Sequence, residues 1–250
     1  MLGKYIRVKV TKPIHSVNQQ YGYEYLLNFG VVDSGKRFDK NIRGVYIMGI
    51  NHPVRSFDGR VIASIRKEGE PGEFLIAAPR KTKFIDAQIR SAVSFAEDMG
   101  KYTLSCLYER SCGAVVYRII NGELRFLLIR NKRSTYWGFP KGHMEKNETK
   151  EDTAKREVLE ETGIHINIIP DFSVKSEYTI QGRVEKTVTI FLASTDDTNT
   201  IIQKEEIEDY VWYNYEKAYE VLKFENDRTI IKKANDFIIK NNILKGENHG

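Results

Sequence analysis

Residues 142–164 of the chain read GHMEKNETKEDTAKREVLEETGI, and this stretch is the natural starting point for predicting the fold. Thr149 and Asp152 have the spacing of a capping box, in which two residues exchange hydrogen bonds at the start of a helix. Gly163 suits the left-handed backbone conformation that ends many helices. We therefore expect a helix over about residues 150–162, preceded by a loop over residues 131–147.

Three glutamates of this expected helix share one face. Glu157, Glu160 and Glu161 stand at positions i, i+3 and i+4. Three converging carboxylates repel one another unless a cation lies between them, and hard oxygen ligands suit Mg²⁺, with Mn²⁺ as the alternative. Arg156 lies four residues from both Asp152 and Glu160, so it can hold a carboxylate in place. Taken alone, the acidic pattern would be more typical of a solvated helix face.

The register of the whole stretch favours a functional site over a solvated face. It matches the pattern G-x5-E-x7-R-E-U-x-E-E-x-G-U, where U is aliphatic, at every position from Gly142 to Ile164. Seven fixed residues at roughly one in twenty each make a chance match rarer than about one in a million. The pattern resembles the Nudix box. This resemblance implies a Nudix fold, with a mixed β-sheet sandwiched by helices, and a metal site formed by Gly142, Glu157, Glu160 and Glu161.

The chemistry expected at such a box is hydrolysis of a phosphate linkage. A metal that bridges phosphate oxygens neutralises charge and polarises phosphorus, and a metal-bound or glutamate-held water attacks in line. Glu157, Glu160 and Glu161 are the candidate catalytic groups, because the metal and the like charges set their protonation. The sequence does not assign the base to one of them.

The residues around the box resemble asymmetrical diadenosine tetraphosphate hydrolases. Residues 137–143 read WGFPKGH, followed by Glu145, and residues 111–117 read SCGAVVY. The similarity covers about residues 108–245, and RNA pyrophosphohydrolases share the W-x-x-P-K-G part. The resemblance implies that Lys141, His143 and Lys186 contact phosphates, that Tyr178 stacks on a base, and that Glu206 is a catalytic group outside the box.

Plainer interpretations of these side chains remain open. Lys141 could be a solvated loop lysine, and His143 could be a structural hydrogen-bonding group. Tyr178 could belong to the core of a sheet, because tyrosine is common in strands.

The chain is expected to form two domains. Residues 1–105 alternate polar and β-branched residues between Gly, Pro and Asp, which predicts a β-rich, barrel-like domain. A helix is expected over residues 86–99, with Gly100 as its stop. Residues 106–250 form the predicted Nudix domain, in which Asn121-Gly122 is a strong hairpin signal. The helix that closes the chain has Asp227 as a candidate cap and an apolar face of Ile230, Ile231, Ala234, Phe237 and Ile238.

The first domain carries a resemblance of its own. Residues 41–61, NIRGVYIMGINHPVRSFDGRV, resemble an inorganic-pyrophosphatase-like β domain. In that family acidic metal ligands stand where this chain has Arg43 and Asn51. Because an arginine replaces a ligand with a cation, we expect no working pyrophosphatase site. Asp58 precedes Gly59 and is interpreted as a turn residue. The domain is therefore expected to be non-catalytic.

Composition indicates which ligands, which cellular compartment and which cysteine state to expect. The formal net charge of +5 suits a polyanionic ligand, although most surface lysines are only solvated. No window approaches the roughly 18 apolar residues of a membrane span, so we expect a cytoplasmic protein without a membrane partner. Cys106 and Cys112 lack the pattern of a disulfide framework or a zinc site and are expected to be buried thiols.

Three functional hypotheses follow from the sequence. The first is asymmetrical hydrolysis of dinucleoside tetraphosphates, giving ATP and AMP from the diadenosine compound. The second is removal of pyrophosphate from RNA 5′ ends, or hydrolysis of another nucleoside-diphosphate-linked compound. The third is a nucleotide sensor that binds without cutting, which the complete set of box glutamates opposes. The expected partner is a nucleotide, RNA is the alternative, and a homodimer remains open.

Overall fold

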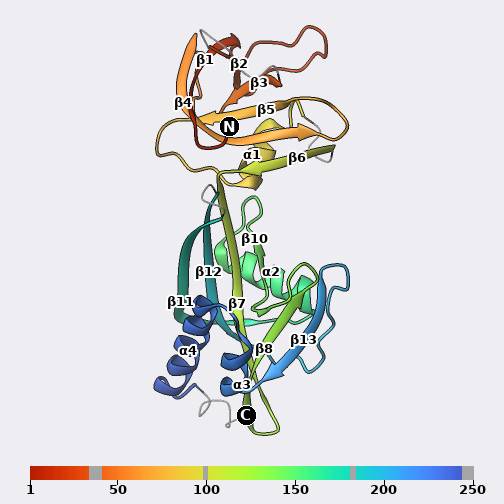
Figure 1. The fold of residues 1–250 in the computed structure, drawn as a ribbon, viewed down its shortest axis with the longest axis vertical. Helices are drawn as coiled ribbons and strands as arrows, with labels where there is room; N and C mark the ends of the chain where they lie inside the picture. The colour runs from red at the N-terminus through yellow and green to blue at the C-terminus, as the bar shows by residue number, and fades with distance from the viewer. Residues whose placement is uncertain (34–40, 98–100, 181–183, 244–250) are drawn as a thin grey trace. The chain divides into compact units, whose positions relative to one another are not determined.

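The protein is described from a computed structural model that covers residues 1–33, 41–97, 101–180 and 184–243 (Figure 1). The chain divides into two compact units. Unit 1 comprises Met1–Glu109 and Tyr178–Lys186, and unit 2 comprises Arg110–Glu177 and Thr187–Gly250. The domain boundary after residue 105 stays a proposal, and the sequence did not anticipate that Tyr178–Lys186 groups with the N-terminal unit.

Unit 1 is built on a closed barrel of five strands. They are β1 (Tyr5–Lys12), β2 (Asn28–Val32), β3 (Ile42–Ile47), β4 (Ser56–Lys67) and β5 (Glu73–Ala78). The order is β1-β2-β3-β5-β4, and pairing of β1 with β4 closes the ring. The expected barrel-like domain is therefore confirmed, whereas its resemblance to pyrophosphatases remains a prediction from sequence.

The length of β4 explains how the barrel closes. Residues 56–60 of β4 pair with β1, and residues 63–67 pair with a sixth strand, β6 (Tyr102–Cys106). The interior is apolar and is filled by Ile6, Val8, Val45, Ile47, Val61, Leu75 and Ala77. A second cluster joins the outside of the barrel to α1 (Asp86–Val93) through Ile89 and Val93. The helix is shorter than predicted, and residues 98–100 lie outside the described residues.

The structure shows the surroundings of Arg43 and Asp58, two residues of this unit that the sequence singles out. Arg43 donates a hydrogen bond to Glu70 (2.6 Å) and lies over the ring of Phe74 (4.9 Å). The interpretation of Asp58 as a turn residue is wrong, because Asp58 lies within β4 opposite Arg7 of β1. The barrel continues through the Asp-Gly dipeptide because strand pairing on both sides of it outweighs the local turn preference.

The sheet of unit 2 has β11-β12-β7-β8-β13 as its main path. Its strands are β7 (Tyr108–Ile120), β8 (Glu123–Asn131), β11 (Asn167–Ile180), β12 (Val184–Ser194) and β13 (Ile207–Tyr213). Two short strands, β9 (Trp137–Gly138) and β10 (Lys141–His143), pair with β8 and β7. The predicted hairpin joins β7 to β8, and Asn121 and Gly122 both have positive φ (54° and 79°).

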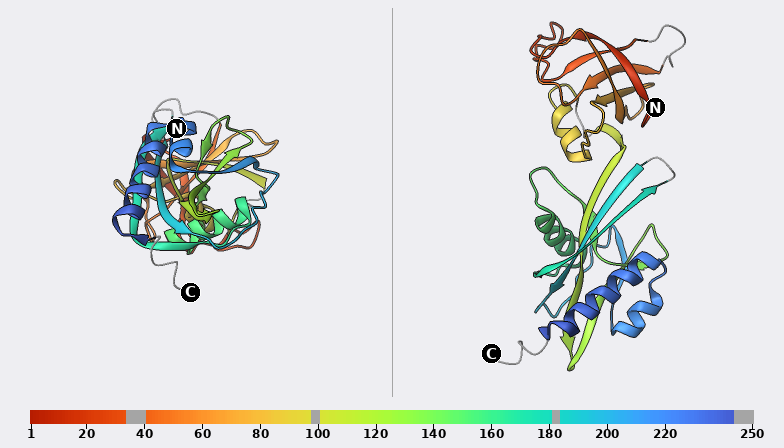
Figure 2. Two further views of the ribbon diagram at one scale, coloured as in Figure 1. Left: turned by 90° about the horizontal axis from the view of Figure 1, so that it is seen from below. Right: turned by 90° about the vertical axis from the view of Figure 1, so that its left-hand side faces the viewer.

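Helices cover both faces of this sheet, as Figure 2 shows. Val115 and Tyr117 of β7 pack in one cluster with α3 (Tyr215–Val221) and α4 (Glu225–Lys240). The alternate residues Ala114 and Val116 pack in another cluster with α2 (Lys150–Thr162). Because successive strand residues point to opposite faces, one strand serves both cores. The expected sheet sandwiched by helices in the C-terminal half is confirmed.

Two local predictions in the C-terminal segment need correction. Helix α3 was not predicted from the sequence, and α4 begins two residues earlier than the expected cap. Phe224 is the N-cap of α4, while Asp227 lies in its first turn. Within the described part of the chain, no helix has the length and apolar character needed to cross a membrane.

Candidate active site

Helix α2 has the boundaries that its sequence predicts. The hydroxyl of Thr149 accepts a hydrogen bond from the backbone N–H of Asp152 (3.1 Å), and the Asp152 carboxylate accepts one from the N–H of Thr149 (3.1 Å). Gly163 ends the helix in the left-handed conformation (φ 68°). Ala154 and Val158 anchor the helix to the sheet, because both are fully buried. The glutamates are thereby fixed relative to the sheet.

Arg156 binds three glutamates of the box at once. Its Nε and Glu148 Oε1 are 2.6 Å apart, and its Nη1 donates to Glu157 (2.8 Å) and Glu160 (2.9 Å). The Nη2 atom donates to the backbone carbonyl of His143 (2.8 Å). The guanidinium holds the pKa of Glu148 down to about 2. Arg156 therefore organises the carboxylates and joins the helix to β10 (Lys141–His143).

Glu161 is the most buried of the box glutamates. It is 6% exposed, and its Oε2 accepts a hydrogen bond from the backbone N–H of Lys141 (2.9 Å). Burial, and then the charge of Glu157, raise the pKa of Glu161 to about 8. Burial also raises the pKa of Glu157, despite the neighbouring Arg156. Two desolvated carboxyl groups of this kind are strongly stabilised by a cation.

The carboxyl group of Glu157 leaves no room for a side chain at position 142. A Cβ atom at position 142 would overlap the Glu157 carboxyl group, at distances that real Cβ atoms do not show. Gly142 lies in β10 and pairs with Cys112 of β7. The strand therefore presents bare backbone to a metal-ligand candidate of α2.

The donor set fits a hard divalent cation. Glu157, Glu160 and Glu161 supply carboxylate oxygens, and the backbone of Gly142 lies against them. Nudix hydrolases in general use divalent metal ions. Within the ranges that the structure describes, no three His, Cys, Asp or Glu side chains converge in ligand geometry. One reason that the carboxylates do not converge is Arg156, whose guanidinium donates hydrogen bonds to oxygens of Glu157 and Glu160.

The remaining predicted residues of unit 2 lie around this cluster. Lys141 and His143 belong to β10, and both side chains are exposed. Glu206 is exposed just before β13, and its charge contributes to the raised pKa of Glu161. Their roles in binding and catalysis stay predictions from sequence.

Tyr178 and Lys186 belong to unit 1 rather than to the unit of the box. Tyr178 is 47% exposed in β11. The ammonium group of Lys186 lies 3.3 Å from Glu109, and its neighbour Glu185 accepts a hydrogen bond from Lys83 (2.8 Å). Their assignment to substrate binding remains a prediction from sequence.

A pocket that the sequence did not predict adjoins the box. It has a volume of about 150 Å³ and shares Lys141 and Glu161 with the candidate site. Its other lining residues come from β8, from β9 and the residues that flank it, and from the start of α4: Ile129, Asn131, Ser134, Tyr136, Trp137, Gly138, Phe139, Phe224 and Asp227. No local motif unites them, because they come from segments far apart in the sequence.

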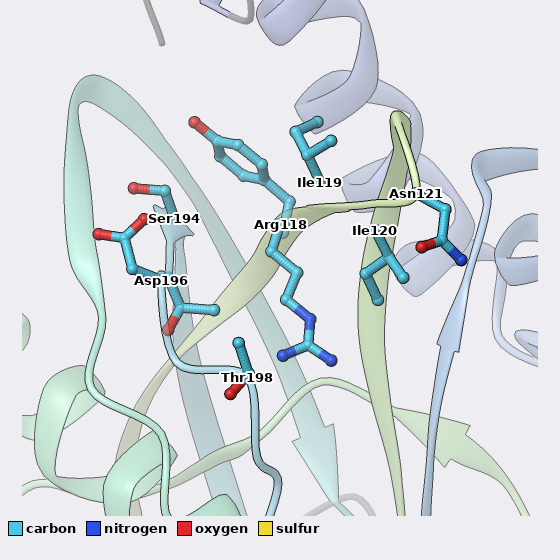
Figure 3. A pocket seen from close by; sticks show the side chains of 9 residues that line it. Arg118, Ile119, Ile120, Asn121, Ser194, Asp196 and Thr198 are labelled. Atoms are coloured by element: carbon cyan, nitrogen blue, oxygen red, sulfur yellow. The ribbon is translucent and has the colours of Figure 1, made fainter. Parts of the chain in front are cut away.

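A second pocket contains none of the predicted site residues. Its volume is about 420 Å³, and it lies where the β7–β8 hairpin meets the segment after β12 (Figure 3). Arg118 points into it, donates a hydrogen bond to the carbonyl of Asp197 and lies over the ring of Trp212 (4.2 Å).

An α-β-α scaffold with clustered glutamates on one helix, beside a glycine and a lysine, is the arrangement of a phosphate-cleaving hydrolase. The NUDIX domain model matches residues 110–234, half of the chain, and the chain belongs to the Nudix hydrolase family. The mouse bis(5′-nucleosyl)-tetraphosphatase (asymmetrical) is 30% identical over 140 residues, which cover 52% of this chain and 95% of the mouse protein.

Similarity extends to a nematode enzyme. The Caenorhabditis elegans bis(5′-nucleosyl)-tetraphosphatase (asymmetrical) is 26% identical over 133 residues, covering 52% of this chain and 96% of its own. A solved structure of a C. elegans Ap4A hydrolase binary complex aligns with a TM-score of 0.49 at 25% identity, covering 53% of this chain and 98% of that one. Each of these alignments covers about half of the chain.

Proposed function

We propose that the protein hydrolyses dinucleoside tetraphosphates asymmetrically, converting diadenosine tetraphosphate and water to ATP and AMP. The observation that carries this proposal is the hydrogen bond from the backbone N–H of Lys141 to Glu161, which brings β10 and its lysine beside the box carboxylates. A polyanionic substrate needs both, since its phosphates must be held and its phosphorus must be attacked. The similarity to two bis(5′-nucleosyl)-tetraphosphatases supports the choice of substrate.

The metal that this site would hold is Mg²⁺, with Mn²⁺ as the alternative, bound by Glu157, Glu160, Glu161 and the Gly142 backbone. When bound, it neutralises phosphate oxygens and makes phosphorus more electrophilic. Lys141 and His143 bind and orient the phosphate chain, and Tyr178 and Lys186 are proposed to stack on a base and to contact phosphate.

The hydrolytic step needs a proton acceptor. A water oxygen forms a bond to phosphorus, a phosphoanhydride P–O bond breaks, and the water proton passes to a carboxylate. Glu161 is a candidate for this role, because it is the most buried of the box glutamates and lies beside Lys141. Glu157, Glu160 and Glu206 are the other candidates for the catalytic set.

The test compares substrates under one condition. We expect the protein with Mg²⁺ to release ATP and AMP from diadenosine tetraphosphate, as identified by chromatography. Nucleoside triphosphates, ADP-ribose and 5′-triphosphorylated RNA are the competing substrates. Efficient release of pyrophosphate from RNA, with the dinucleotide left intact, would contradict the proposal.

Variants test the site itself. Glu160→Gln and Glu161→Gln are each expected to lower kcat by at least about hundredfold, because each removes a negative ligand or base. Glu151→Gln on the same helix is the matched control, since Glu151 is exposed in the first turn and outside the cluster. Turnover that survives both changes would show that the carboxylates do not serve the reaction.

A further inference from the structure

The pocket beside the box has the size and lining of a site for one planar ring system. Its volume of about 150 Å³ is below the roughly 300–1,000 Å³ of pockets that hold drug-sized ligands. Tyr136 and Phe224 line it, with ring centroids 5.4 Å apart and planes at 78°. Both rings are about half exposed, at 45% and 53%. Exposed aromatic rings are surfaces on which nucleobases stack.

The pocket also connects to the phosphate-cleaving site. Lys141 and Glu161 belong to both, so a ligand that fills the pocket extends directly toward the box carboxylates. A nucleotide has this combination, with a flat base at one end and phosphates at the other.

Asp227 makes the pocket favour ligands that donate hydrogen bonds. Among the described residues, its carboxylate makes no hydrogen bond or ion pair, although it lines the pocket and is partly buried in the first turn of α4. Burial raises its pKa, and the positive charge of Lys141 opposes that rise. A desolvated carboxylate without a partner is costly, so a ligand that donates hydrogen bonds to it gains free energy.

The other polar groups of the pocket can donate. The Asn131 side-chain oxygen accepts a hydrogen bond from the N–H of Arg133 (3.0 Å), which leaves its amide NH₂ to donate. The Ser134 oxygen accepts one from the N–H of Tyr136 (3.2 Å), which leaves its hydroxyl hydrogen to donate. The pocket thus pairs an acceptor with two donors.

We propose that this pocket recognises guanine, with Asp227 as the residue that determines specificity. Guanine presents two adjacent donors, N1–H and the N2 amine, which match both oxygens of one carboxylate. Its O6 and N7 atoms accept from donors such as Asn131 and Ser134. Adenine places the acceptor N1 beside its single donor group, so it can satisfy only one carboxylate oxygen and repels the other. The inference rests on the proposed function in that the substrate is a nucleotide.

Binding of nucleoside monophosphates tests the proposal without any hydrolysis. Titration calorimetry in the absence of a divalent metal should give a Kd for GMP about ten- to hundredfold lower than for AMP, because hydrogen bonds to charged groups are worth about 1.5–3 kcal/mol. IMP retains N1–H but lacks the N2 amine, so its Kd should lie between the two. Equal or tighter binding of AMP would overturn the proposal.

Variants locate the preference at one side chain. In Asp227→Asn and Asp227→Ala the ratio of the GMP and AMP constants should fall to about one. Asp236→Asn is the matched control, because Asp236 lies on the same helix, is exposed and pairs with Lys232. A preference that persists in both Asp227 variants would contradict the assignment.

Kinetics then separate the two proposals. The wild-type kcat/KM for diguanosine tetraphosphate should exceed that for the diadenosine compound, and Asp227→Asn should remove the difference. If GMP binds preferentially but no tetraphosphate is cleaved, only the proposed function fails. If tetraphosphates are cleaved without preference for guanine, only the guanine pocket fails.

Discussion

Gly142 and Glu157 show how closely two residues of the box depend on each other. The glutamate carboxylate occupies the space that a side chain at position 142 would need. Glu157 in turn accepts a hydrogen bond from Arg156, which also binds Glu148 and Glu160. A change at the glycine would therefore displace several carboxylates at once.

Gly142→Ala is the corresponding experiment. We expect it to lower the free energy of unfolding by about 1–3 kcal/mol, the usual cost of overpacking, and to lower kcat with it. Gly138→Ala is the control for stability, because a Cβ there meets no heavy atom within 4 Å. Urea denaturation monitored by circular dichroism measures both variants. Equal stability of the two would show that Glu157 moves aside freely.

At the scale of single elements, α2 owes its length to residues at both ends. Gly163 has a φ of 68°, and its N–H donates to the carbonyl of Leu159 (2.8 Å). A Cβ there would lie 3.1 Å from the carbonyl oxygen of Ile201. An alanine would thus meet both an unfavourable backbone conformation and a close neighbour.

Gly163→Ala should therefore destabilise the protein by about 1–2 kcal/mol, which is the cost of the left-handed conformation for a residue with a Cβ. Gly163→Asn should retain part of the lost stability, since asparagine tolerates that conformation better. Lys155→Ala, on the exposed side of the same helix, should change stability by less than about 0.5 kcal/mol. Thermal unfolding of the three variants provides the measurement.

The sequence predicted the features that depend on residues close together along the chain and missed those that depend on distant residues. The limits of α2 and the β7–β8 hairpin depend on residues a few positions apart, and both were predicted from those residues. The pairing of β4 with β1, β5 and β6 depends on long-range register, which no local pattern encodes. The pocket residues Asn131, Tyr136 and Asp227 were missed for that reason, because they come from separate segments.

At the scale of the whole molecule, each unit contains one buried thiol. Cys106 belongs to unit 1 and Cys112 to unit 2. Burial raises the pKa of Cys106 to about 12 and that of Cys112 to about 11. Thiolates are the reactive form, so both side chains should be inert in the folded protein at neutral pH.

Thiol labelling and pH titration test this expectation. An aromatic disulfide reagent at pH 8 should label neither cysteine in the folded protein and both in guanidinium chloride, and single Cys→Ser variants assign the sites. Because the folded-state pKa values exceed the ordinary value of 9, the folded state retains more protons above that pH. The free energy of unfolding should therefore be constant in this respect below about pH 8 and fall as pH rises from about 9 to 11. Rapid labelling of either thiol at pH 8 would contradict the burial described.

The grouping of Tyr178–Lys186 with unit 1 also bears on how such a protein can arise. The chain passes between the units after residues 109, 177 and 186, so no single breakpoint separates two complete modules. The Nudix family model spans residues 110–234, so a Nudix domain that joined an N-terminal barrel would bring segment 178–186 with it. Because that segment groups with the N-terminal unit, we expect a chain in which a foreign barrel is exchanged at residue 110 to be less stable than the present one.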